Sequence, residues 1–353
     1  MNSSSNPFYI IAPRYTQTSA GVRVLYKICD LINKNGYSAY IFLRPHIKLS
    51  PIFPDNLIAP ILTAEIRDYH FNNGLTPIVI YPETFSISKF NAPFRVPYFL
   101  NYPELLSQKK ASKDDHYILS YSMNISKKIM STLPGKIIFL PVSDHNFFIP
   151  PSKNKNSMRS GSVFYAGKYK YHFNGTLFDI TKNSIEITRD QPLSQSREQI
   201  RKLFQEADLF FCYEDSALAL EAILCECPVV FLPNKHFKEC LGSHELNGLG
   251  FAWGLSNKKI QHARKTVKIA RARYIKLLKE SNSSVKSFAD EVQLLVKAIK
   301  YNKPFADDYL KNKFSFFFFG GYTRFFIEYI QDHGFRKFFK TLFKRIKFRR
   351  FKL

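Results

Sequence analysis

Short apolar runs alternate with longer segments of helical periodicity along most of this chain, and this alternation constrains the fold more than any other feature. Residues 8–13 form an apolar run that ends in proline, a polar loop follows, and residues 37–43 form the next apolar run. The segment between them ends at Asn35 and Gly36 and places apolar side chains on one helical face: Val22, Leu25, Ile28, Cys29 and Ile32. A strand–helix–strand unit of this kind crosses over right-handed and predicts a parallel sheet.

The same alternation continues in two blocks. Further apolar runs at 77–81, 117–122 and 136–142 extend the first sheet, and a polar stretch at 150–161 reads as a linker. A second set of expected strands lies at 162–167, 184–189, 208–214 and 228–233, with a helix after the N-cap Ser196 and another within 216–226. We therefore expect an α/β fold of two doubly wound, Rossmann-like domains facing a cleft. The expected boundaries are residues 1–150, a linker at 151–161, a second domain at 162–300 and a helical C-terminal segment at 301–353.

The charge balance indicates anionic partners. The chain carries 52 Lys and Arg against 28 Asp and Glu, a formal net charge of +24, which suits an anionic substrate, an anionic membrane surface or a nucleic acid. No helix-turn-helix, zinc or RNA-recognition pattern supports the nucleic acid. The five cysteines form no paired C-x-x-C motif, which favours reduced, buried thiols. With no signal peptide and no membrane-spanning run, a cytoplasmic protein is expected.

The last twenty residues, 334–353, differ from the rest. Between Arg336 and Lys352 there are nine Lys or Arg residues and no acid, and phenylalanines recur three and four residues apart. This pattern predicts a basic amphipathic helix that lies on an anionic membrane surface. Two alternatives remain for this segment, which are packing of the phenylalanine face against the protein and contact with nucleic acid.

Three expected strand ends carry residues suited to a ligand. Thr18, Ser19 and Gly21 precede a helix, whose first amides favour an anion. Residues 166–175 follow a strand with a glycine and two lysines, which suit phosphate. Residues 213–234 open with two glutamates, Glu214 and Glu221, where a strand passes into a helix. Parallel strands bring such ends to one edge of the sheet.

In this order, four segments resemble the group 1 family of GT-B glycosyltransferases, over roughly residues 6–255. They are "SAGVRVLYKICDLINKNGYSAYIF", "FLPVSDHNFFIP", "FYAGKYK" and "YEDSALALEAILCECPVVF". The resemblance implies that Glu221 accepts hydrogen bonds from the ribose of a nucleotide-sugar donor and that Lys168 neutralises the diphosphate. The sequence departs from the family pattern in the spacing of Glu214 and Glu221, which is one residue short, and in Glu226, which replaces a glycine.

The site that the resemblance implies has eight residues. Glu214 and Lys168 would be catalytic, and the donor would be held by Gly21, Gly167, Lys168, Lys170, Arg189, Ser216 and Glu221. Asn91 and Arg95, in the first domain, are candidate contacts for the acceptor. No D-x-D pair follows an expected strand, so neither a metal ion nor another cofactor is expected.

The implied activity is transfer of a sugar from a nucleotide donor to a saccharide acceptor. We further expect a lipid-linked acceptor and a role in the synthesis of bacterial surface polysaccharide, such as lipopolysaccharide O-antigen or capsule. The expected location is peripheral, at the inner face of the cell membrane. The family as a whole retains the anomeric configuration. A GT-B-like sugar-nucleotide epimerase and a basic nucleic-acid-binding protein are the alternatives.

Overall fold

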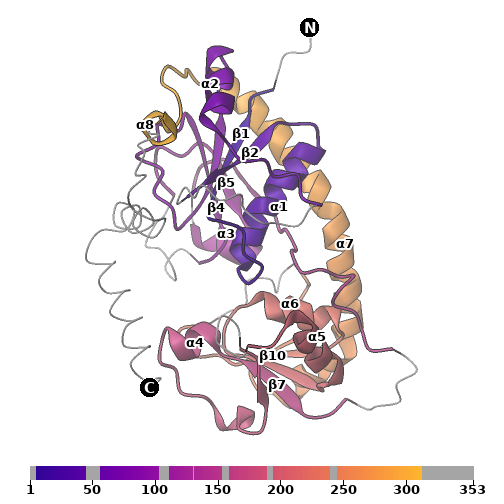
Figure 1. Ribbon diagram of the computed structural model, residues 1–353. Coiled ribbons are helices and arrows are strands. Elements are labelled where there is room, and N and C mark those ends of the chain that lie inside the picture. Colours follow the sequence, from indigo (N-terminus) through magenta and orange to yellow (C-terminus); the bar gives the residue numbers. More distant parts are fainter. Residues whose placement is uncertain are drawn as a thin grey trace, which may run out of the picture.

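A first parallel sheet of six strands forms the upper part of the molecule in Figure 1. The computed structural model describes residues 5–44, 56–102, 111–129, 131–152, 159–188, 194–238 and 245–311. The sheet has the order β2-β1-β3-β4-β5-β6, with strands β1 (Phe8–Ala12), β2 (Ala39–Leu43), β3 (Ile78–Pro82), β4 (Phe94–Phe99), β5 (Ile118–Ser120) and β6 (Gly135–Ile137). All five residues of β1 are buried, which is why this strand is a continuous apolar run in the sequence.

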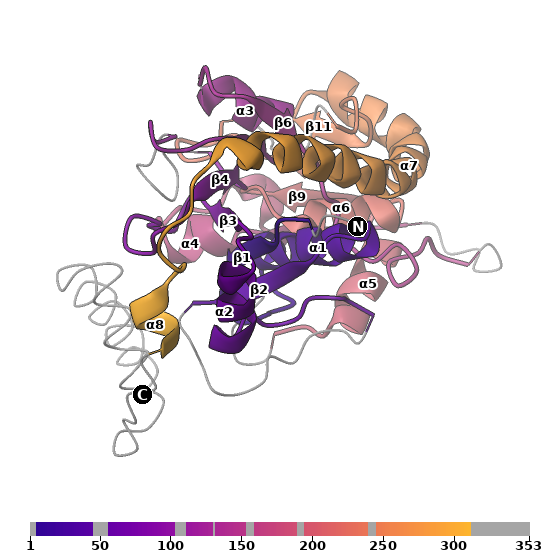
Figure 2. The same cartoon turned by 90° about the horizontal axis from the view of Figure 1, so that it is seen from above.

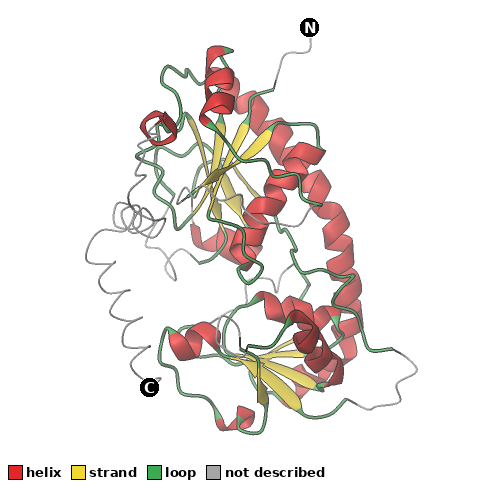
Figure 3. Ribbon diagram, in the orientation of Figure 1, coloured by secondary structure: helices red, strands yellow, loops and turns green. Residues whose placement is uncertain are grey.

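A second parallel sheet of five strands lies below the first (Figures 1 and 3). Its order is β11-β10-β9-β7-β8, with strands β7 (Ser162–Tyr165), β8 (Ile185–Glu186), β9 (Leu209–Cys212), β10 (Val229–Phe231) and β11 (Phe251–Trp253). In both sheets the second strand lies on one side of the first and the third strand on the other. The chain therefore reverses its winding between β1 and β3, and again between β7 and β9, and such a switch point is where α/β sheets bind ligands.

The described residues also form eight α-helices and two short 3-10 turns. The helices are α1 (Ala20–Lys34), α2 (Ala64–Asn72), α3 (Met123–Ile129), α4 (Gly167–Tyr171), α5 (Arg197–Glu206), α6 (Ala217–Leu224), α7 (Asn257–Leu295) and α8 (Asp307–Lys311), and the turns are Asp179–Thr181 and Val296–Ala298. Ser196 caps α5 as predicted, and its capping box is completed by Gln199. Ser19 and Ser216 cap α1 and α6 through their side chains.

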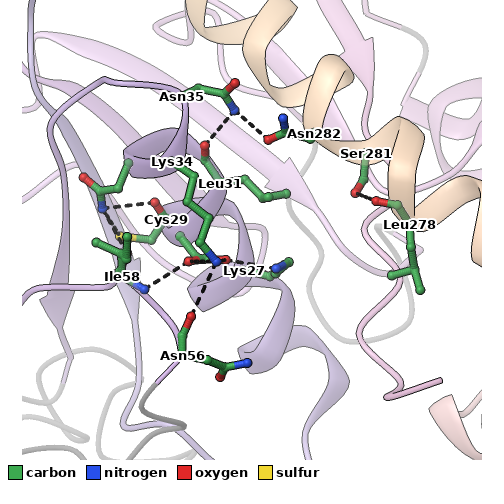
Figure 4. Close-up of polar contacts among 12 residues, drawn as sticks. Lys27, Cys29, Leu31, Lys34, Asn35, Asn56, Ile58, Leu278, Ser281 and Asn282 are labelled. Carbon is green, nitrogen blue, oxygen red and sulfur yellow. Dashed lines mark hydrogen bonds and ion pairs between the residues drawn. The ribbon is translucent and has the colours of Figure 1, made fainter. Parts of the chain in front are cut away.

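Helix α7 joins the two halves of the molecule, and it runs along both sheets in Figures 1 and 2. Its first half buries Val267 and Tyr274 in the core of the second sheet, whereas its second half buries Phe288 and Val292 in the core of the first. At its middle, Asn282 accepts a hydrogen bond of 2.9 Å from the side chain of Asn35 at the end of α1 (Figure 4). The sequence assigns residues 162–300 to the second domain, but the second half of α7, within this range, packs in the core of the first domain.

The predicted fold class of two doubly wound domains is confirmed, and it is the arrangement that the resemblance to GT-B enzymes implies. Strand β6 is shorter than the predicted run 136–142, and β4 and β11 were not predicted. Glu226 adopts a left-handed conformation with φ of 57°, the geometry that explains a glycine at this place in the family pattern.

Several sequence predictions fall wholly or partly outside the described residues. They include the basic tail at 334–353, Arg189, Cys240 and the middle of the linker at 153–158. The other four cysteines are free and buried. Within the described part of the chain, no helix is long and apolar enough to cross a membrane.

Candidate functional site

A cavity of about 950 Å³ lies between the two sheets, at the carboxyl ends of strands from both. Residues that follow β1 and β3 line it from the first domain, and residues that follow β7 and β9 line it from the second. The cavity therefore touches both topological switch points at once. Its volume is in the range of pockets that hold small ligands and cofactors.

The first-domain wall is built from the ends of four neighbouring strands and the start of α1. Glu83 follows β3, Asn101 follows β4 and Tyr121 follows β5, while Phe139 comes from the segment after β6. The rings of Tyr121 and Phe139 pack with their centroids 4.9 Å apart. This wall combines a carboxylate, an amide and two aromatic rings, the side-chain types that bind hydroxyls and the apolar faces of a sugar.

The second-domain wall carries opposite charges. The side chain of Lys168 in α4 is exposed to the cavity, and among the described residues no acid forms an ion pair with it. Glu214 and Asp215 lie where β9 ends, and Ser216 begins the turn into α6. A cation beside two carboxylates can hold a ligand that is anionic at one end and rich in hydroxyls at the other.

Two helix N-termini point into the same cavity. Ala20 and Gly21 are the first residues of α1, a helix of 15 residues, and both line the cavity. Ala217 is the first residue of α6 and lines it from the opposite side. The first amides of a helix have no intrahelical acceptor, and the helix dipole makes this end positive, so both termini favour an anion.

The Glu214 carboxylate binds the backbone of the 166–175 segment, which the sequence predicts to bind a phosphate. Its Oε2 accepts a hydrogen bond of 2.8 Å from the backbone N–H of Tyr169 in the first turn of α4. Burial raises the pKa of Glu214, while the nearby Lys168 and the α4 amides act in the opposite direction. Because Glu214 already binds a backbone amide of the 166–175 segment, the group that this segment can offer a ligand is the Lys168 ammonium.

Glu221 does not line the cavity, in contrast to the role that the resemblance implies. It is 2% exposed, and its Oε1 lies 3.6 Å from Nη2 of Arg23 in α1 of the first domain. Nη1 of Arg23 also donates to the backbone oxygen of Val142, at the crossing between the domains. Just beyond, the Tyr274 hydroxyl from α7 exchanges hydrogen bonds of 2.9 Å with the backbone N–H and oxygen of Ser143. Glu221 thus belongs to the contact that joins the domains, because its helix turns it toward α1.

Five of the eight predicted site residues come together in the cavity lining, namely Gly21, Gly167, Lys168, Glu214 and Ser216. Lys170 points elsewhere, because its Nζ forms an ion pair of 2.7 Å with Glu186 on β8. Gly167 has a packing reason to be glycine, since a Cβ there would collide with the Tyr165 ring. The alternative acceptor contacts also lie outside this lining: Asn91 borders a second, smaller cavity, and Arg95 pairs with Asp114.

Glu83 lines the cavity but is not among the eight predicted site residues. Its place directly after a strand allows two readings from the sequence alone, an acceptor-side loop or an ordinary strand end. Glu83 is 4% exposed, and its Oε2 accepts a hydrogen bond of 3.0 Å from the backbone N–H of Leu100. No described cation forms an ion pair with it. Burial therefore raises the pKa of Glu83 from 4.5 to about 6.

This shift predicts a pH-dependent loss of stability. Because the folded protein has the higher pKa, the stabilising contribution of Glu83 is complete below pH 4.5 and is lost as the pH rises through about 6. Relative to Glu83→Gln, the free energy of unfolding of the unmodified protein should fall by about 2 kcal/mol between about pH 4 and about pH 8. Urea unfolding of both proteins across this range measures the difference, and a difference that is independent of pH would contradict the buried, unpaired carboxyl.

Comparisons with known proteins give similarity of backbone alone. No protein-family model matches the sequence, and no curated protein does. The chain is similar to WaaG, a glycosyltransferase involved in lipopolysaccharide biosynthesis, with 11% identity and a TM-score of 0.44 over 83% of this chain and 100% of WaaG. It is also similar to the N-terminal domain of trehalose-6-phosphate phosphatase from Candida albicans, with 7% identity and a TM-score of 0.46 over 84% of this chain and 97% of that domain. The glycosyltransferase SnogD from Streptomyces nogalater has 10% identity and a TM-score of 0.43, over 82% and 100% of the two chains. At these low sequence identities no residue's role can be transferred from the similar structures. The roles proposed for this chain therefore rest on the residues that line its own cavity.

Proposed function

We propose that the protein is a glycosyltransferase that moves a sugar from a nucleotide-sugar donor to a saccharide hydroxyl. The observation that carries the proposal is the cavity at the two switch points, where Lys168 and the first turns of α1 and α6 supply positive potential and Glu214 and Asp215 supply carboxylates beside them. A nucleotide-sugar has the matching chemistry, with a diphosphate between two groups that carry hydroxyls.

In this proposal the diphosphate lies near Lys168 and the amides of Gly21 and Ala217. As the bond to the anomeric carbon breaks, negative charge grows on the diphosphate, and a fixed ammonium and helix termini stabilise that charge. Glu214, which also accepts from the backbone of α4, is proposed to accept hydrogen bonds from donor hydroxyls. Because protein groups can supply the positive charge, we propose that the transfer needs no metal ion.

The donor assay tests this function. Incubation with radiolabelled UDP-, GDP- and dTDP-sugars, with and without lipid extract, should release the nucleotide from one donor and move the label to an acceptor. Conversion of a donor to an epimer without any acceptor would identify an epimerase instead. Absence of any turnover, together with retention on immobilised nucleic acid, would favour the basic nucleic-acid-binding alternative.

We further propose that the acceptor is lipid-linked, that the pathway is surface polysaccharide assembly, and that the enzyme works at the inner face of the membrane. The support is the sequence of residues 334–353, whose nine cations between Arg336 and Lys352 stand among regularly spaced phenylalanines.

A flotation experiment measures this attachment. The full chain should float with anionic vesicles and less with zwitterionic ones, since each cation near the surface contributes about 1 kcal/mol. A chain that ends at Asp332 should remain at the bottom of the gradient. Equal flotation of both chains, or flotation of neither, would contradict a membrane role for the tail.

A further inference from the structure

We propose that Glu83 is the general base that takes the proton from the acceptor hydroxyl, and that the transfer therefore inverts the anomeric configuration. This inference rests on the glycosyltransferase function proposed above and names the group that activates the acceptor. It departs from the retention that the family resemblance implies.

The position of Glu83 is the first reason. It directly follows β3, on the far side of the first-domain switch point from the N-terminus of α1. The cavity that it lines is lined from the other domain by Lys168. A donor whose diphosphate is bound by Lys168 and α1 would therefore place its sugar between the two walls, with Glu83 on the acceptor side.

The surroundings of Glu83 are the second reason. Asn101, Tyr121 and Phe139 lie on the same wall, and these side chains can bind a saccharide through an amide and two aromatic rings. The Leu100 amide holds one carboxylate oxygen in place. A carboxylate that a backbone donor fixes at the border of a ligand cavity is in a suitable place to accept a proton from a bound hydroxyl.

The charge environment is the third reason. The titratable groups that line this cavity on other elements are Tyr121, Tyr165, Lys168, Tyr171, His172, Glu214 and Asp215. None of them is a source of the shift in the pKa of Glu83, which burial raises to about 6. A buried carboxyl without an ion-pair partner destabilises the fold, and such groups cluster at sites where the reaction needs them. With this pKa the carboxylate is ionised near neutral pH and is a better proton acceptor than an exposed glutamate.

The proposed step balances as a single displacement. The acceptor hydroxyl oxygen forms a bond to the anomeric carbon while the bond from that carbon to the diphosphate oxygen breaks. The bonding electron pair leaves with the diphosphate, and the hydroxyl proton moves to the Glu83 carboxylate, which later releases it to water. Attack from the face opposite the leaving group inverts the configuration.

The experiment compares the unmodified protein with Glu83→Gln, Glu83→Asp and a control, Glu65→Gln, whose exposed side chain lies in α2 outside the cavity. We expect Glu83→Gln to lower kcat by about 100-fold or more, with unchanged affinity for the nucleoside diphosphate in calorimetry. Glu65→Gln should have normal activity. The kcat of the unmodified protein should fall as the pH drops through about 6, and proton NMR of the product should show the anomer opposite to that of the donor.

Three results decide the matter. If the unmodified protein transfers sugar but Glu83→Gln keeps kcat within about threefold, or if the product retains the donor configuration, the base role is wrong and the proposed function stands. If Glu83→Gln does not fold, the product configuration and the pH profile of the unmodified protein still decide, together with Glu83→Asp. If the unmodified protein neither binds nor turns over any nucleotide-sugar, the proposed function and this inference both fail.

Discussion

Replacement of Lys168 with alanine should lower the turnover number for sugar transfer by roughly 100-fold, the usual cost of removing one stabilising group from a developing anion. The side chain is exposed to the cavity, and no described acid forms an ion pair with it, so its charge is available to the leaving diphosphate. Steady-state kinetics with a saturating donor measures the effect. Lys168→Arg should retain much of the activity, because it keeps the charge although it changes the geometry of the donors.

Lys170→Ala is the matched control for this loss. Lys170 lies two residues further along the same short helix, but its ammonium pairs with Glu186 outside the cavity lining. The Lys170→Ala substitution should therefore leave the turnover number nearly unchanged. EDTA should have little effect on the activity of the unmodified protein. Equal losses for both lysines would indicate damage to α4 rather than loss of a phosphate contact, and inhibition by EDTA that Mn²⁺ reverses would contradict the metal-free proposal.

Replacement of Glu221 with alanine should lower the free energy of unfolding by about 3 kcal/mol or more, because it leaves the buried guanidinium of Arg23 without its counter-ion. The side chains of the two residues are only 3% and 10% exposed, so water cannot compensate for the lost partner. Denaturant unfolding of Glu221→Ala, Arg23→Ala and the double variant gives the coupling between the two positions. The double variant should lose less stability than the sum of the single losses.

Glu206→Ala is the control for the effect of removing a helical glutamate from the same domain. Glu206 is exposed, and its partner Lys202 lies 3.9 Å away on the surface of α5, so the change should be within about 0.5 kcal/mol. Full stability of Glu221→Ala together with loss of nucleotide binding would contradict the structural role, and would return Glu221 to the ribose contact that the resemblance implies.

The alternating pattern of the sequence predicted most of the fold, because buried parallel strands are short apolar runs and the helices between them keep a clear periodicity. Strand β4 was missed since Pro93 and Pro97 within and beside its run argue against a central strand. Strand β11 was missed because its three residues stand between Gly250 and Gly254, and a stretch punctuated by glycines is typical of a loop. The second half of α7 was assigned to the wrong core, because periodicity shows that a helix has a buried face but not what covers it.

The candidate site was predictable where it depends on strand ends and less so where it depends on side-chain direction. Lys168, Glu214 and Ser216 reach the cavity because residues after a parallel strand gather at one edge of the sheet. Glu221 lies more than one turn into α6, where a rotation of the helix decides whether it faces a ligand or α1. Asn101 could not be assigned without β4, and the burial that sets Glu83 apart is a property of the folded chain alone.

Isothermal titration calorimetry with UDP, GDP and dTDP tests the central claim that the cavity binds a nucleoside diphosphate. We predict that at least one of them binds with a stoichiometry of one, that Lys168→Ala weakens this binding by about tenfold, equivalent to about 1.4 kcal/mol, and that Lys170→Ala does not. Absence of binding by all three at about 1 mM, an affinity limit near 4 kcal/mol, would contradict the account, as would binding that is indifferent to Lys168.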